Sequence, residues 1–265
     1  MPRVWVRGLG ELGTGVAHLL HRLGYSVMGS ELQLPRSIRQ PVCFSQAMFT
    51  GSTQVEGVEA RAVAAVGEEL EYPATAIPVL KDSDNLHQFF KPDIYIDARM
   101  LKKDVEDSRS LANCCIGLGP GFEVNRNCHI VIETRRGHTL GRVILQGGSE
   151  PDTGVPGVLG GKGSERLIRS PGQGFVKWEV AFGALVKQGE IVGRLSDGSD
   201  VITAIEGMMR GMISPQVPVE PGMKIGDVDP RGAVIDYRLI SDKTRLIASG
   251  VLEAILLKTQ GDPHG

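Results

Sequence analysis

Three glycines near the start of the chain, Gly8, Gly10 and Gly13, have the spacing G-x-G-x-x-G. In a strand–turn–helix connection, the first allows a tight turn, the second lets a pyrophosphate approach the backbone, and the third lets the helix pack closely. Glu31 follows about twenty residues later, where a carboxylate can hold the hydroxyl pair of a ribose. These four residues predict nucleotide binding; the alternative is the same connection with no ligand.

Two polar residues near the ends of predicted strands could transfer protons. Asp97 ends the apolar segment 93–98, and His138 follows the apolar segment 129–133. Open α/β sheets bind ligands at the carboxyl ends of their strands, and histidine exchanges protons near neutral pH. A structural ion pair for Asp97 and a hydrogen-bonded loop position for His138 are the alternatives. The catalytic residues are therefore unknown, with Asp97 and His138 as candidates.

A second glycine-rich turn follows the apolar segment 114–118 and contains Gly117, Gly119 and Gly121. Its backbone N–H groups could cradle an anion, and Arg136 could clamp a phosphate or a carboxylate. We therefore add these three glycines and Arg136 to the predicted cofactor-binding residues. A tight turn without a ligand explains the glycines nearly as well.

The identity of the nucleotide stays open. Glu31 favours a free ribose hydroxyl, as in NAD, whereas Arg36 and Arg39 lie just beyond the same strand and could meet the 2′-phosphate of NADP. Surface arginines with no ligand are the alternative. The expected cofactor is a nucleotide, NAD(P) or another.

The sequence patterns around these residues predict an α/β domain over residues 1–165. Short apolar segments at 4–6, 77–80, 93–98, 114–118 and 129–133 are typical of buried strands. Residues 16–23 have helical spacing, residues 51–66 alternate as in a hairpin, and residues 32–49 are expected to be helical in their later part. A Rossmann-like, mostly parallel sheet is the predicted architecture.

The pattern changes after residue 166 to short strands and turns. VKQGEIVG and VEPGMKIG repeat each other around Gly189 and Gly222, as in a pseudo-symmetric all-β barrel. This segment, residues 166–240, resembles the barrel-sandwich fold of lipoyl and biotinyl carrier domains. The tip between the halves is Asp197-Gly198 and has no lysine, so neither biotin nor lipoate is expected. Residues 241–265 are predicted to form a C-terminal helix and tail, with Ser241 as the N-cap.

Composition excludes several classes of protein. With 29 basic and 31 acidic residues and 5% aromatic residues, the chain lacks the electrostatic footprint of a nucleic-acid-binding protein. It contains no apolar segment long enough to span a bilayer, so a cytoplasmic protein without a membrane partner is expected. The four cysteines lack C-x-x-C spacing, and we predict inert thiols and no metal site.

Six segments together suggest a family: RGLGELGTGVAHLLHRLGY, IGLGPGF, VIETRRGHTLGRVI, EPDTGVPG, KIGDVDPRG and ISDKTRLIASGVLEAIL. They resemble the accessory protein family of the selenium-dependent molybdenum hydroxylase system. This resemblance implies a maturation factor whose partner is a molybdenum hydroxylase or its cofactor. It implies no defined reaction, so whether the protein is an enzyme is uncertain, and the oligomeric state is unknown. An NAD(P)-dependent oxidoreductase and a non-enzymatic, nucleotide-responsive scaffold are the alternative functions.

Overall fold

The computed structural model describes residues 1–64 and 75–260, and the chain is a mixed α/β protein. It divides into two compact units. The first unit consists of Met1–Gln33, Cys43–Thr153 and Ile240–Gly265, and the second of Leu34–Val42 and Gly154–Leu239. The domain limits at residues 165 and 240 stay predictions.

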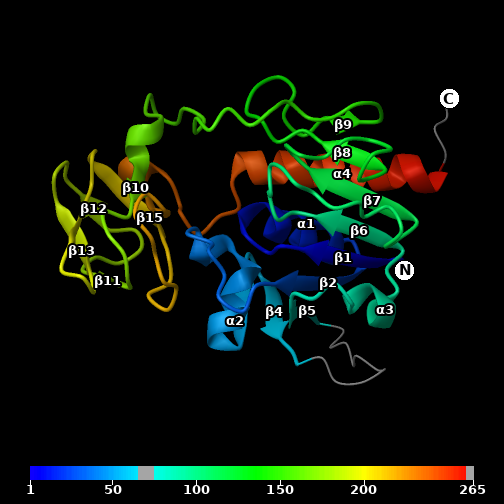
Figure 1. Ribbon diagram of the computed structural model, residues 1–265, viewed down its shortest axis with the longest axis horizontal. Helices are drawn as coiled ribbons and strands as arrows, with labels where there is room; N and C mark the ends of the chain where they lie inside the picture. The colour runs from blue at the N-terminus through cyan, green and yellow to red at the C-terminus, as the bar shows by residue number, and fades with distance from the viewer. Residues whose placement is uncertain (65–74, 261–265) are drawn as a thin grey trace. The chain divides into compact units, whose positions relative to one another are not determined.

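The first unit is built on a nine-stranded sheet (Figure 1). Its strands are β1 (Arg3–Arg7), β2 (Ser26–Glu31), β3 (Ser52–Val55), β4 (Val58–Ala62), β5 (Ala76–Lys81), β6 (Ile94–Asp97), β7 (Cys114–Leu118), β8 (Ile130–Ile132) and β9 (Val143–Ile144). In space their order is β3-β4-β5-β2-β1-β6-β7-β8-β9, parallel from β4 to β8 and antiparallel at both edges. From β1 the chain adds β2, passes to the edge hairpin of β3 and β4, and returns to place β5 beside β2; it then builds outward on the other side of β1 from β6. The strand order therefore reverses between β1 and β6, the position at which open sheets bind ligands.

One face of this sheet is covered by α1 (Glu11–Arg22) and α4 (Asp242–Gln260). The C-terminal helix α4 packs beside α1 and against β7, β8 and β9 (Figure 1). The connections from β6 to β7 and from β7 to β8 contain no helix among their residues, all of which are described, so α4 covers the strands that crossover helices usually cover. Ser241 is the predicted N-cap: its hydroxyl accepts a hydrogen bond from the Thr244 N–H at 3.3 Å.

The other face of the sheet carries an aromatic core. Trp5 is paired in register with Met28 on one side and Tyr95 on the other, and Tyr95 with Cys115. Because side chains along a strand alternate between the two faces of a sheet, residues paired in register share a face, and these four side chains lie on the same one. There the rings of Trp5 and Tyr95 meet edge to face with centroids 4.9 Å apart. The short helix α3 (Leu86–Phe90) closes this core.

The predicted hairpin is confirmed as β3 and β4, which pair antiparallel around Glu56-Gly57. Both turn residues have positive φ, as a two-residue hairpin turn requires. Val66, at the end of the predicted segment, lies outside the described residues, as does the tail from residue 261. The helix expected late in residues 32–49 is reduced to the 3₁₀ turns Gln40–Val42 and Phe44–Gln46 and the four-residue helix α2 (Ala47–Thr50).

The second unit contains two antiparallel sheets. Their strands are β10 (Leu167–Arg169), β11 (Val176–Trp178), β12 (Leu185–Val186), β13 (Ile191–Leu195), β14 (Asp200–Ile202), β15 (Gly207–Met212) and β16 (Lys224–Asp229), and 3₁₀ turns occur at Ser164–Arg166 and Gly232–Val234. The two repeated segments have matching turns, because Gly189 and Gly222 have φ of 78° and 79° and precede β13 and β16. Across the part of the chain that the structure describes, no helix has both the length and the apolar character needed to cross a membrane.

Candidate functional site

The glycine turn between β1 and α1 is shaped by close backbone contacts. Gly8 has φ of 89°, and a Cβ there would lie 3.0 Å from the backbone nitrogen of Arg99. A Cβ on Gly13 would overlap the carbonyl oxygen of Gly8. The turn therefore needs glycine at Gly8 for its conformation and at Gly13 for the approach of the helix to the turn.

The N-terminus of α1 is uncapped and accessible. Gly10 is the N-cap residue, in an extended conformation, and it has no side chain to accept a hydrogen bond from the helix. Among the described residues, the N–H groups of Gly10 and Leu12 have no acceptor, and both residues are partly exposed. Unpaired N–H groups and the positive end of the helix dipole favour an anion at this position.

Glu31, the last residue of β2, joins this turn directly. Its Oε2 accepts a hydrogen bond from the Leu9 N–H at 2.8 Å, and its Oε1 accepts one from the Leu32 N–H at 2.8 Å. Burial raises the pKa of Glu31, and nearby Asp82 raises it further, whereas the two backbone hydrogen bonds lower it. A carboxylate has about four acceptor positions, so Glu31 retains capacity for the hydroxyls of a ligand.

A segment that the sequence analysis did not connect with the site holds the turn in place. The Ser45 N–H donates to the Leu9 carbonyl at 3.1 Å, and the Phe44 N–H donates to the Thr14 hydroxyl at 2.8 Å. That hydroxyl donates to the Leu9 carbonyl at 2.8 Å. The 3₁₀ turn Phe44–Gln46 therefore braces the glycine turn through backbone atoms, which no side-chain pattern reveals.

Asp97 is engaged in a structural ion pair. Its side chain is 1% exposed and accepts hydrogen bonds from the Arg99 guanidinium at 2.6–3.1 Å and from the Tyr95 hydroxyl at 3.2 Å. The exposed pair Asp107 and Arg109 has the same local geometry, with the backbone N–H of the arginine also bound to the aspartate. The arrangement is thus a recurrent Asp-x-Arg turn, and the geometry favours the structural alternative for Asp97.

Neither Arg136 nor His138 forms a hydrogen bond or an ion pair with the glycine turn in the part of the chain that the structure describes. Arg136 forms a two-point ion pair with Asp242 at 3.0 and 3.2 Å, and His138 is exposed without a hydrogen-bond partner in the described part of the chain. Lys243, which the sequence analysis missed, lies in the first turn of α4 beside this pair. Burial lowers the pKa of the Lys243 amine, Arg136 lowers it further, and Glu11 and Glu133 oppose the change.

Packing explains each glycine of the second turn. A Cβ on Gly117 would overlap the ring of Phe122, and one on Gly119 would overlap the hydroxyl of Thr134. Gly121 has φ of 94°, and its Cβ would lie 2.9 Å from the backbone of Lys102. These glycines therefore let the loop after β7 pack closely against the loops that contain Lys102 and Thr134.

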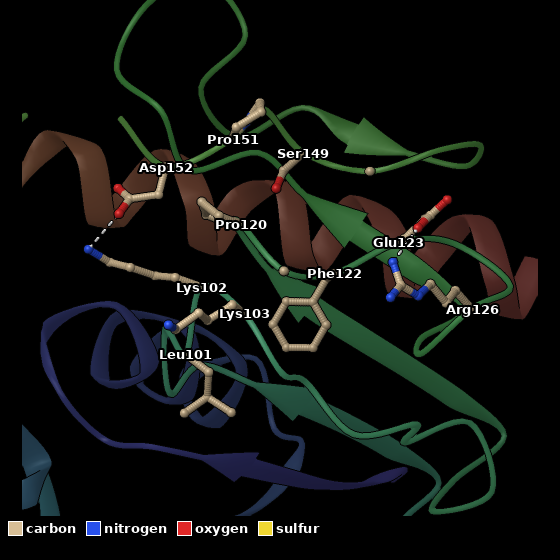
Figure 2. Close-up of a pocket in the computed structure, with 12 residues that line it drawn as sticks. Leu101, Lys102, Lys103, Pro120, Phe122, Glu123, Arg126, Ser149, Pro151 and Asp152 are labelled. Carbon is tan, nitrogen blue, oxygen red and sulfur yellow. Dashed lines mark hydrogen bonds and ion pairs between the residues drawn. The ribbon is translucent and has the colours of Figure 1, made fainter. Parts of the chain in front are cut away.

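The loop after β7 borders a cleft of about 610 Å³ at the carboxyl ends of β6 and β7 (Figure 2). It is lined by residues 101–103, 120–123, 148–149 and 151–152 and by Arg126. Buried Glu133 fixes the segment 148–152, because its carboxylate accepts hydrogen bonds from the N–H groups of Glu150, Thr134 and Arg135 at 2.6–2.7 Å. No group of three or more metal-ligating side chains occurs in the ranges that the structure describes.

The thiols of Cys114 and Cys115 on β7, and of Cys128 just before β8, are buried, and their reaction with alkylating reagents should be slow. Burial raises the pKa of Cys114 to about 11 and that of Cys115 and Cys128 to about 12. Because the pKa of an exposed thiol is about 8.5, we expect iodoacetamide at pH 8 to modify these cysteines at least about 100-fold faster in urea than in the folded protein. Peptide mapping by mass spectrometry measures this ratio. Rapid modification of folded Cys114 or Cys115 would contradict it.

Comparison with known proteins gives one clear sequence relative. No family model matches the chain. It is 39% identical over 256 residues to a protein of Escherichia coli K12 described as "Uncharacterized protein YqeB". The alignment covers 96% of this chain but 47% of that protein, so the chain spans about half the length of its curated relative.

Among solved structures, one similar chain is the ectoine utilization protein EutE (DoeB) of Ruegeria pomeroyi, with 10% sequence identity and a TM-score of 0.27. An aspartoacylase family protein of Mesorhizobium loti has 12% identity and a TM-score of 0.29. A succinylglutamate desuccinylase/aspartoacylase of Rhodobacter sphaeroides has 11% identity and a TM-score of 0.26. Each alignment covers 86% of this chain and 84% of the other. Sequence identities and TM-scores this low do not indicate a shared activity.

These comparisons correct the family and the function expected from the sequence. The curated relative is described as uncharacterized, and the solved structures are described as an ectoine utilization protein, an aspartoacylase family protein and a succinylglutamate desuccinylase/aspartoacylase. None of these names refers to molybdenum or selenium. The assignment to the selenium-dependent molybdenum hydroxylase system, and with it the role as a maturation factor, is therefore withdrawn.

Proposed function

We propose that the first unit is a Rossmann-like domain that binds a dinucleotide with a free ribose 2′-hydroxyl, with NAD as the first candidate. The observation that carries this proposal is the uncapped N-terminus of α1 beside Gly10, placed where the strand order reverses, with the carboxylate of Glu31 bound to the same turn. A helix N-terminus, a glycine turn and an acid at the end of the second strand are the parts that this mode of binding uses.

Each part has a defined role in this proposal. The N–H groups of Gly10 and Leu12 donate to the pyrophosphate, and the absence of a side chain at Gly10 keeps the space open. Glu31 accepts hydrogen bonds from the ribose hydroxyls while keeping its bond to Leu9. A 2′-phosphate would place negative charge against this carboxylate, so NADP should bind more weakly than NAD.

For the second unit we propose a barrel-sandwich fold that carries no prosthetic group. The matched turns at Gly189 and Gly222 support the two-fold repeat. At the tip, the Asp197 carboxylate accepts hydrogen bonds from the N–H groups of Gln173 and Ser199, so this residue closes the turn.

Isothermal titration with NAD, NADP and ATP tests the proposed dinucleotide site. The wild type should bind NAD most tightly, and Gly10→Val should weaken NAD binding at least about 100-fold, because a branched side chain fills the pyrophosphate space. The φ of Gly10 is −62°, which valine adopts, so the fold should survive. The control is Lys177→Val, at an exposed position of strand β11 in the second unit, where the extended backbone accepts valine. No nucleotide binding by the wild type, or equal affinity in folded Gly10→Val, would reject the proposal.

A further inference from the structure

The cleft at the carboxyl ends of β6 and β7 is a second concave feature of the first unit, built by other loops than the glycine turn. Its volume of about 610 Å³ falls within the range of small-molecule sites. In open α/β sheets this edge is where ligands bind. The position and size of the cleft therefore suit a small molecule.

Two adjacent lysines give the cleft its charge. The Lys102 ammonium pairs with the Asp152 carboxylate at 2.9 Å across the cleft, whereas Lys103 has no hydrogen-bond or ion-pair partner in the described ranges (Figure 2). Arg126 and Glu123, also at the cleft, pair with each other at 3.1 Å. Among the charged residues that line the cleft, the uncompensated charge is thus the ammonium of Lys103.

A buried hydroxyl supplies a second, independent sign of a ligand. The Oγ of Ser149 is almost fully buried and has no hydrogen-bond partner among the described residues, although Ser149 itself lines the cleft and is partly exposed. Figure 2 shows Ser149 on the side of the cleft that faces Pro120 and Phe122. An unsatisfied buried hydroxyl is unfavourable, so its persistence at a cleft requires an explanation such as a bound acceptor.

The backbone that carries the lysines is held in an unusual conformation. Met100, Lys102 and Asp104 have φ of 58°, 72° and 52°, the left-handed region that residues other than glycine rarely adopt. Gly121 packs against the backbone of Lys102 and helps to impose this conformation. Strain of this kind persists where the surrounding structure fixes it, and it concentrates at ligand sites.

We propose that this cleft binds a small organic acid, whose carboxylate is held by Lys103 and the Ser149 hydroxyl. The carboxylate compensates the lone ammonium and accepts the hydrogen bond that Ser149 cannot make within the described chain. The side chains of Leu101, Pro120 and Pro151 contact an apolar body. This ligand is distinct from the dinucleotide and its binding requires only the cleft.

Phenylacetate is the probe, and ligand-observed NMR with titration measures its binding to the wild-type protein. Saturable binding is expected, with at least about tenfold weaker affinity in Lys103→Gln, because the interaction with the carboxylate loses its charge. Lys91→Gln is the control: it removes another lysine of the same unit, away from the cleft. The uncharged isostere 2-phenylethanol should not compete. Equal competition by inorganic phosphate, or no saturable binding of phenylacetate, overturns the proposal.

Ser149→Ala separates a ligand site from a structural residue. Because the hydroxyl has no partner in the described part of the chain, its removal should leave Tm unchanged or raise it, while the affinity for phenylacetate should fall about fivefold or more. A drop in Tm with unchanged affinity overturns the role of Ser149. Gly10→Val should bind phenylacetate like the wild type, so failure of the dinucleotide proposal and failure of this one give different results.

Discussion

Replacing Asp229 by alanine is expected to destabilise the second unit by about 3–5 kcal/mol, the cost of breaking a buried ion pair by removing one partner. Asp229 is 0% exposed, and its carboxylate accepts hydrogen bonds from Arg210 at 2.8 Å and from the guanidinium and backbone N–H of Arg231 at 2.8–3.0 Å. Arg210 also binds buried Asp227, which pairs with Arg166 as well. Loss of Asp229 removes one of the two carboxylate partners of Arg210, whose side chain is 12% exposed, and a carboxylate partner of Arg231, which is 42% exposed.

Asp236→Ala is a matched control for this effect. Asp236 and Arg238 form the same Asp-x-Arg turn in the same unit, with the backbone and side-chain N–H groups of the arginine bound at 2.9–3.0 Å, but the Arg238 side chain is 69% exposed. An exposed pair contributes about 0–1 kcal/mol. Urea unfolding in a Trp5→Phe background follows the second unit through Trp178, because each unit contains one of the two tryptophans. Equal destabilisation by the two changes would show that burial of the network is unimportant.

The Asp229→Ala variant should also change how the free energy of unfolding depends on pH in acid. Burial alone raises the pKa of Asp229, but hydrogen bonds from Arg231 and the charges of Arg210 and Arg231 lower it below the usual value overall. A carboxyl with a lowered pKa stabilises the folded state above the unfolded pKa of about 4, and this contribution is lost as the pH falls through the folded pKa. The loss of stability below about pH 4 should therefore be shallower in Asp229→Ala than in the wild type.

A Gly13→Ala variant is expected to be less stable than the wild type by about 1–3 kcal/mol, although alanine is the better helix former. Helix propensity alone would favour alanine in α1 by about 1 kcal/mol. The added methyl group would overlap the carbonyl oxygen of Gly8, a backbone atom that cannot move without deforming the turn. The free-energy cost of the steric overlap should therefore exceed the gain in helix propensity. Because the overlap displaces the turn that is proposed to bind the pyrophosphate, the affinity for NAD should also fall.

Gly250→Ala in α4 is the control for this second prediction. Its methyl group would overlap the carbonyl oxygen of Gly141, so the same kind of collision occurs away from the glycine turn. Unfolding followed through Trp5 in a Trp178→Phe background should show similar destabilisation in both variants, whereas NAD titration should show weaker binding in Gly13→Ala alone. A Gly13→Ala protein with wild-type stability would mean that the turn adapts easily.

Local sequence patterns determined the elements of the first unit. The apolar segments at residues 4–6, 77–80, 93–98 and 114–118 form β1, β5, β6 and β7, and the turn Glu56-Gly57 forms the predicted hairpin. These elements follow from periodicity and from the φ that a tight turn requires, both of which depend on a few neighbouring residues. The same holds for α4, whose start was marked by Ser241.

Only the tertiary structure decided which residues meet across the chain. Arg136 pairs with Asp242 over a separation of 106 residues, α4 covers β7–β9, and residues 34–42 belong to the second unit. It also decided that Asp97 pairs with Arg99, whereas Lys103, four residues further along the same loop, has no hydrogen-bond or ion-pair partner among the described residues. A sequence pattern reports the period of a segment and its exposed face, but the partner of a charge depends on which distant segments pack beside it.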